Sequence, residues 1–144
     1  MNDLVDLKSS LFRGLSIAPQ SVGIGATVTG TGIDCRQCGA EIVVEVAVGA
    51  VGASGTVTVT IESSANNNTA DASAAADAYT QVGGVSETTS TLALSGTDAN
   101  TVVVMKCILR NEKYIRVKAV GAVAATLLSA VILGSPRVTG TVPA

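Results

Sequence analysis

Apolar and polar residues alternate along much of this chain, as they do in β-strands that bury one face. The pattern is clearest in residues 56–62, where apolar residues alternate with threonines. Residues 41–48 and 113–120 repeat it, with Glu41 and Glu45 on the polar face of the first segment. The three segments predict a shared core formed by Ile42, Val44, Val46, Val48, Val57, Val59, Ile61, Ile115, Val117 and Ala119.

Shorter or more apolar segments complete the set of predicted strands, at residues 79–82, 89–94, 101–109 and 126–133. The last is apolar on both faces, which predicts a strand that is covered on two sides. Residues 49–55 and the break at Gly121-Ala122 are expected to connect hairpins. Six to eight strands without a long helix favour an all-β fold, namely an antiparallel β-sandwich or jelly-roll-like single domain.

The first residues of the chain follow a different period. Leucines recur at spacings of three and four, which predicts a short amphipathic helix that ends near Gly14. Pro19 stops this helix, and the residues up to 32 are extended and rich in glycine. We therefore expect an N-terminal arm over residues 1–32 and a sandwich domain over residues 33–144. The apolar residues expected to contact a neighbouring subunit are Leu4, Leu7, Leu11, Phe12 and Leu15.

A frayed N-terminal tail is the alternative to such an arm. If the arm exists, deletion of residues 1–20 is expected to leave the sandwich folded and to weaken its binding to the partner.

The composition favours a component of an assembly over an enzyme. Charged residues make up 14% of the 144 positions and hydrophobic residues 47%, whereas soluble domains usually carry about 25% charged residues. A chain so poor in charge exposes many small apolar groups, which is easier to explain if other subunits cover part of its surface. A net charge of −2 supplies no field that would gather nucleic acid.

No group of residues predicts catalysis. The sequence has no histidine, which excludes Ser-His, Cys-His and histidine-ligated metal sites. Glu41 and Glu45 could form a carboxylate pair, but a solvated strand face explains them better. We expect no catalytic residue, no metal site and no cofactor.

The three cysteines form no disulfide framework, because one is left over. Cys35-Arg-Gln-Cys38 has the spacing of half a zinc site, yet neither a second such pair nor a histidine supplies the remaining ligands. We expect all three to be reduced and structural, with Cys107 in the core.

Residues 119–136, between Lys118 and Arg137, carry no charge. The length of this uncharged stretch is close to the shortest length of a membrane helix. Their glycines and β-branched residues favour strands instead, and the N-terminus lacks the pattern of a signal peptide, so we expect no membrane partner. The one basic cluster is expected to be a solvated strand face or a patch that meets an acidic partner, and it comprises Arg110, Lys113, Arg116 and Lys118.

Three stretches, in order, resemble a family of small bacteriophage virion proteins, the capsid cement or decoration β-sandwiches. They are Gly30-Thr-Gly-Ile-Asp34 before Ala40-Glu-Ile-Val-Val-Glu-Val-Ala-Val-Gly49, Thr56-Val-Thr-Val-Thr-Ile-Glu-Ser-Ser64 with Tyr79-Thr-Gln-Val82, and Lys113-Tyr-Ile-Arg-Val-Lys118 with Val131-Ile-Leu-Gly134. The resemblance implies a non-enzymatic protein that binds the outer face of the phage head, bridges capsomers and resists the pressure of packaged DNA. The implied partners are the major capsid protein and neighbouring copies of the chain, often as a trimer, on virions assembled in the host cytoplasm.

Another class of protein stays open at this point, a tail- or fibre-associated β-sandwich for adhesion to surfaces or carbohydrates. Sugar sites usually expose aromatic rings, and this chain has two tyrosines and one phenylalanine. A small hydrolase is disfavoured because the chain has neither a histidine nor a convincing carboxylate pair.

Overall fold

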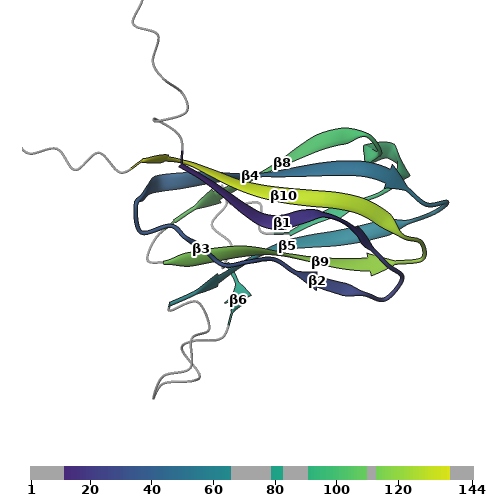
Figure 1. Ribbon diagram of the computed structural model, residues 1–144, viewed down its shortest axis with the longest axis horizontal. Helices are drawn as coiled ribbons and strands as arrows, with labels where there is room; N and C mark the ends of the chain where they lie inside the picture. The colour runs from purple at the N-terminus through teal and green to yellow at the C-terminus, as the bar shows by residue number, and fades with distance from the viewer. Residues whose placement is uncertain (1–11, 66–78, 83–90, 110–112, 137–144) are drawn as a thin grey trace, which may run out of the picture.

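The computed structural model describes residues 12–65, 79–82, 91–109 and 113–136, which form two facing β-sheets (Figure 1). The first sheet, sheet A, has the strand order β1-β10-β4-β8, and the second, sheet B, has the order β2-β9-β5-β6. Two further strands belong to sheet B, with β3 paired to β9 and β7 paired to β5. All pairs are antiparallel.

The strands of sheet A are β1 (Phe12–Val22), β4 (Cys38–Val51), β8 (Thr101–Ile108) and β10 (Thr126–Pro136). The strands of sheet B are β2 (Thr27–Thr29), β3 (Ile33–Asp34), β5 (Thr56–Ser64), β6 (Thr80–Gln81), β7 (Thr91–Leu94) and β9 (Tyr114–Ala122). A single turn of 3₁₀ helix, η1 (Gly96–Asp98), precedes β8. These elements confirm the predicted all-β antiparallel sandwich.

The topology is that of a jelly roll. If β2 and β3 count as one strand, and β6 and β7 as another, the two sheets have the orders 1-8-3-6 and 2-7-4-5. Every connection crosses from one sheet to the other except the one between β5 and β6, within sheet B. This arrangement is the one that a double-sheet jelly roll uses to bury two inner faces against each other.

Two predicted hairpins are wrong for the same reason. Strand β4 in sheet A extends to Val51, and residues 52–55 connect it to β5 in sheet B, so the chain passes over the end of the sandwich instead of turning back on itself. The break near Gly121 likewise separates β9 in sheet B from β10 in sheet A, and Val123 turns the chain there with a φ of 66°. Each break between strands was predicted correctly, but the destination of the next strand was not.

The predicted core is confirmed at every position. All ten residues are at most 3% exposed, and they lie on the inner faces of β4, β5 and β9. The other large side chains of this core come from β1, β7, β8 and β10, and they include Ile17, Leu94, Met105, Leu128 and Ile132. The period-two pattern therefore identified the inner faces of the three strands where it is regular.

The N-terminal prediction is corrected from Phe12 onward. Residues 12–14, expected to end a helix, begin β1, which pairs with β10 along its length. The chain from Phe12 to residue 32 belongs to the sandwich, because β1 lies in sheet A and β2 in sheet B. Deletion of residues 1–20 would thus remove the buried Ile17 and most of a strand. The predicted helix over Leu4, Leu7 and Leu11 lies outside the described residues.

Candidate interaction face

The outward side of sheet A is rich in apolar residues. The strand register aligns Leu15, Val131, Glu45 and Val104 in one row across β1, β10, β4 and β8. A neighbouring row contains Arg13, Leu133, Val43 and Lys106, and a third contains Ser129, Ala47 and Val102. We call this outward surface the sheet A face.

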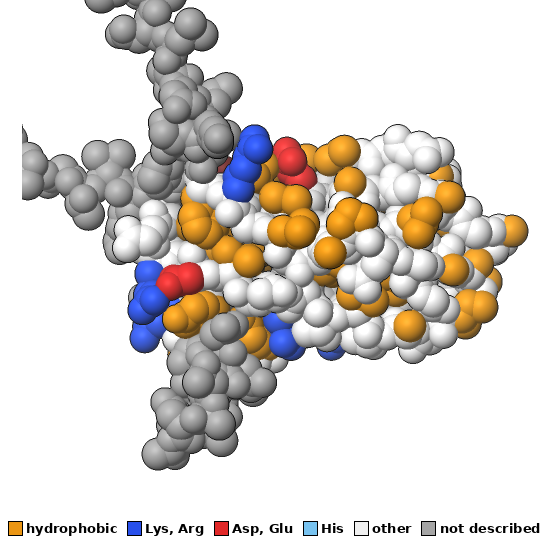
Figure 2. Space-filling view, in the orientation of Figure 1, with side chains coloured by type: hydrophobic (Ala, Val, Ile, Leu, Met, Phe, Trp, Pro, Cys, Tyr) orange, Lys and Arg blue, Asp and Glu red, His pale blue; other side chains and the backbone are white. Residues whose placement is uncertain are grey.

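Several large side chains on the sheet A face are exposed to solvent. Val102 is 61% exposed, Val104 55%, Leu15 53% and Leu127 48%. Figure 2 shows apolar side chains spread over the visible side of the molecule, with few charged ones among them. An antiparallel sheet that covers a core usually presents polar residues on its other face, so this composition marks the sheet A face as a surface for contact.

The outward side of sheet B has the opposite character. Threonines from β5 lie beside basic residues of β9, with Thr60 opposite Lys118 and Glu62 opposite Arg116. Thr27 and Thr29 of β2 and Thr91 of β7 extend the same side. The two outward faces of the sandwich are therefore unlike, one apolar and one polar.

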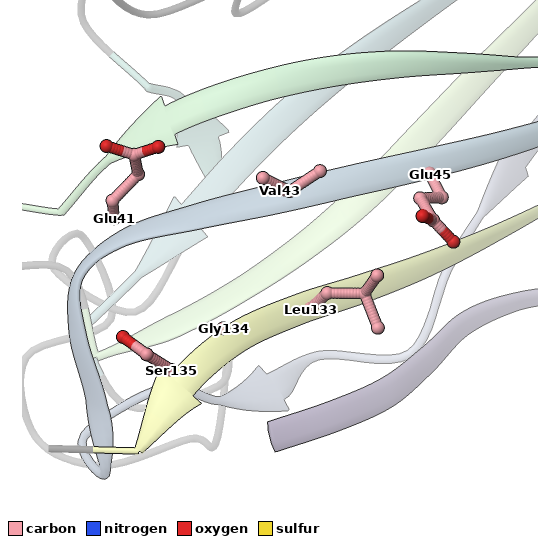
Figure 3. A pocket seen from close by; sticks show the side chains of 6 residues that line it. All are labelled: Glu41, Val43, Glu45, Leu133, Gly134 and Ser135. Carbon is pink, nitrogen blue, oxygen red and sulfur yellow. The ribbon is translucent and has the colours of Figure 1, made fainter. Parts of the chain in front are cut away.

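Two shallow hollows lie on the sheet A face. One is lined by Glu41, Val43, Glu45, Leu133, Gly134 and Ser135, and Figure 3 shows Glu41 and Glu45 toward opposite ends of it with Val43 between them. The other lies between Pro19 of β1, Gly49 of β4 and Leu127 of β10.

The carboxylates of Glu41 and Glu45 lie on the same strand face. Both are exposed on the outward side of β4, as predicted, and Glu41 forms an ion pair with Lys106 at 3.1 Å. The charges on the sheet A face are therefore few and of both signs.

The predicted basic cluster is part of an ion-pair network on sheet B. The Arg116 guanidinium lies 2.7 Å from Glu62 and the Lys118 ammonium 3.5 Å from the same carboxylate. Glu62 is only 7% exposed, so it needs such partners to be stable in its charged form. Lys113 is exposed just before β9, and Arg110 lies outside the described residues. Arg116 and Lys118 thus have a structural role in the fold.

Both tyrosines are engaged by arginines. Arg116 lies 3.9 Å from the ring centroid of Tyr79, and Arg36 lies 5.5 Å from that of Tyr114. Stacking on sugars requires an open ring face, and these contacts occupy one face of each ring.

The three cysteines are buried thiols, as predicted. Cys35 and Cys38 flank a tight turn in which the Cys38 N–H donates to the Cys35 carbonyl at 3.0 Å. The Arg36 guanidinium forms an ion pair with the Asp34 carboxylate, and the Arg36 backbone N–H donates a hydrogen bond to it. These contacts hold the pKa of Asp34 below its usual value. Burial raises the pKa of both the Cys35 and the Cys38 thiols, so neither is activated as a nucleophile.

The contact residues predicted from the sequence are placed differently by the structure. Leu15 lies exposed on the sheet A face, and Phe12 is half-buried against the core. Leu4, Leu7 and Leu11 are outside the described residues. Val102, Val104 and Leu127 were missed, although the run Val102-Val103-Val104 already signalled a strand that is apolar on both sides.

Comparison with known proteins leaves the fold as the main shared feature. No protein-family model matches the sequence, and no curated protein matches it. Among solved structures, the chain is similar to the PBSX exported protein XepA, with a TM-score of 0.56 and 14% sequence identity. The match covers 92% of this chain, which spans 42% of the length of that structure. The likeness shows that the two share a fold.

In the part of the chain that the structure describes, no helix is long and apolar enough to cross a membrane. The uncharged stretch after Lys118 instead forms the end of β9 and the whole of β10, one strand in each sheet.

Proposed function

We propose that this chain is a structural protein of a phage virion, a decoration protein that binds the outer face of the head and bridges neighbouring capsomers. The observation that carries the proposal is the contrast between the two outward faces. The sheet A face is apolar and suits a protein surface, whereas the outward side of sheet B is polar and suits solvent. A protein that lies flat on a particle needs such a pair of faces.

The physical basis of this function is buried area. Burial of apolar surface is worth about 25 cal/mol per Å², and an interface of about 1,000–2,000 Å² gives a gross term of tens of kcal/mol, from which the costs of association are subtracted. A head carries many copies of a decoration protein, so even a modest net term for each copy stabilises the shell against outward pressure.

The likeness to XepA, a PBSX exported protein, is one of fold, and it supports the β-sandwich architecture on which the proposal builds. It does not identify the partner, since one fold serves many functions. The major capsid protein is the partner that the resemblance to cement proteins implies, and it is the partner we propose for the sheet A face. The protein would then be located on the capsid surface of virions assembled in the host cytoplasm.

The proposal is tested by co-sedimentation with DNA-free heads of the phage that encodes the chain. Leu15→Glu and Leu127→Glu each place a charge on the sheet A face, and each is expected to weaken binding by about tenfold or more, because a buried leucine is worth about 1.5–3 kcal/mol. Thr58→Glu is the matched control, because Thr58 is exposed on the outward side of sheet B. Equal binding by all three variants would show that the sheet A face is not the contact surface.

The N-terminal arm is tested separately, with a corrected deletion. Removal of residues 1–11 leaves β1 complete, whereas removal of residues 1–20 does not. We expect the shorter deletion to preserve the unfolding midpoint and to reduce occupancy on heads. Unchanged occupancy would remove the arm from the binding mechanism. Binding of the purified chain to a glycan array but not to heads would support the adhesion alternative.

A further inference from the structure

The open edges of the two sheets are unequally protected. Of the edge strands that the structure describes, β2, β3, β6 and β7 in sheet B are two to four residues long. In sheet A, β1 is interrupted by two irregularities in register and contains Pro19, which has no N–H to donate. Short strands, bulges and prolines are the devices by which proteins prevent an edge from pairing with another chain.

Strand β8 has none of these devices. It is eight residues long, Thr101–Ile108, and contains neither proline nor glycine. Its eight consecutive pairs with β4 show no shift in register. In the strand order of sheet A, β8 is the last strand, so over residues 101–106 one side of its backbone faces no strand within the described residues. A regular, β-branched edge of this length is a template for another strand.

Apart from Lys106, the side chains of β8 lack the charges that protect an exposed edge. Val102 and Val104 point outward and are among the most exposed large apolar residues of the described chain. Val103 points toward the core, but it is only partly buried. Lys106 is the one charged residue of the strand, and it is paired with Glu41 of the neighbouring β4. The edge of β8 is therefore suited to pair with another β-strand.

We propose that β8 pairs with β8 of a second copy of this chain, antiparallel and around a two-fold axis, so that the two A sheets form one continuous eight-stranded sheet. A two-fold axis perpendicular to the sheet keeps both sheet A faces on the same side. It brings Val102 and Val104 of one copy beside Val102 and Val104 of the other. The two-fold pair buries the same residues on both copies.

Charge supports a second copy as the occupant. With the axis at Val103, Lys106 of each copy comes opposite Asn100 of the other. With the axis at Val104, it comes opposite Val102. In neither register do like charges face each other across the pair, which is the arrangement that would oppose self-pairing. The proposal does not rest on the proposed function, because it concerns the chain in the absence of any particle.

The test uses the full chain and paired charge variants. Val102→Lys with Val104→Lys places like charges across the axis, and so does Val102→Glu with Val104→Glu. Each double variant is expected to raise the dimer dissociation constant by about 100-fold or more, measured by sedimentation velocity, since facing like charges cost several kcal/mol. A mixture of the Lys and Glu forms is expected to recover a dimer that contains one copy of each, identified by native mass spectrometry.

The matched control is Leu15→Lys with Leu127→Lys, which adds the same charge to the sheet A face away from β8 and is expected to leave the dimer intact. Hydrogen exchange on the wild-type chain provides a second measurement that does not depend on how the variants fold. Protection of those amides of residues 101–106 that point away from β4 is expected to fall on dilution, while that of β4 and β10 stays constant. A wild-type chain that sediments as a monomer or a trimer, or a Lys variant that dimerises like the wild type, would overturn the proposal.

Discussion

The backbone N–H of Val117 donates a hydrogen bond to the side-chain hydroxyl oxygen of Ser16 at 2.9 Å, across 101 residues of sequence. Ser16 lies in β1 of sheet A and Val117 in β9 of sheet B, so this bond joins the two layers. The same hydroxyl donates to the carbonyl of Thr31 at 3.0 Å, and Ser16 is only 4% exposed. The Ser16 side chain thus links β1 both to β9 and to the segment that follows β2.

Ser16→Ala is expected to lower the free energy of unfolding by about 1–3 kcal/mol, because it leaves the buried N–H of Val117 without its acceptor. The change is measured as a shift of the urea midpoint at constant slope. Ser21→Ala, at an exposed position of the same strand, is the control and is expected to leave the midpoint unchanged. Equal midpoints for the two variants would show that water replaces the Ser16 hydroxyl at no cost.

Gly30 allows its own segment of backbone to approach the backbones of Ser16 and Val117 closely. Its N–H donates to the Val117 carbonyl at 2.8 Å, and a Cβ at this position would lie 2.7 Å from the Ser16 carbonyl oxygen and 2.8 Å from that of Val117. Because those atoms are backbone, Gly30→Ala is expected to destabilise the fold by about 1–3 kcal/mol. Gly96→Ala is the control, since a Cβ there meets nothing within 4 Å. A Gly30→Ala variant as stable as Gly96→Ala would mean that the backbones of Ser16 and Val117 can move apart at no cost in stability.

Thr126, the first residue of β10, carries a hydroxyl that is buried and has no hydrogen-bond partner. Thr126→Val replaces that hydroxyl with a methyl group of similar size and keeps the β-branch. We expect the thermal midpoint to rise, with a gain of about 1 kcal/mol, because burial of an unpaired hydroxyl opposes folding. Thr126→Ser, which keeps the hydroxyl and removes the methyl, is expected to lower it. A loss of stability in the valine variant would indicate that the hydroxyl is hydrated in solution.

Alkaline pH is expected to destabilise the fold through Cys35. Burial raises the pKa of this thiol above its ordinary value of 9.0, so the folded state keeps it protonated while the unfolded state ionises. The contribution of the protonated Cys35 thiol to the free energy of unfolding is complete below pH 9.0. It declines as pH rises above that value, by up to about 1.4 kcal/mol per pH unit. Urea unfolding between neutral and alkaline pH, under reducing conditions, measures the slope. Cys35→Ala is expected to flatten it, and identical slopes would assign the effect to other groups.

The sequence predicted best the parts of the fold where alternation is unbroken. β9 keeps period two along its length and β5 keeps it from Thr56 to Ile61, and their inner residues Val57, Val59, Ile115 and Val117 are fully buried. The first residues of β1, 12–14, were mistaken for the end of a helix, and alternation is broken just after them, where Ser16 and Ile17 both lie on the buried side. With alternation broken there, leucine spacing was the stronger signal.

The connections could not be predicted because a glycine-rich segment can turn a strand back or carry it across the sandwich. The turn at residues 52–55 is closed by a bond from the Gly55 N–H to the Gly52 carbonyl, which local sequence favours, but the position of β5 depends on its pairing with β9. The sheet A face was also only partly visible in the sequence. The apolar outward side of β10 was taken to be covered, whereas Leu127 is 48% exposed and Val131 and Leu133 are partly exposed.

Strand β10 lies between β1 and β4, although it is the last described strand to be synthesised. Until residue 136 has left the ribosome, the nascent chain contains β1 and β4 without β10, the strand that lies between them. The apolar edges of β1 and β4 are then accessible to chaperones and proteases. Pairings between such distant segments form slowly, because the intervening chain must first be ordered. Sheet A thus cannot be completed until β10 is available to pair with both β1 and β4.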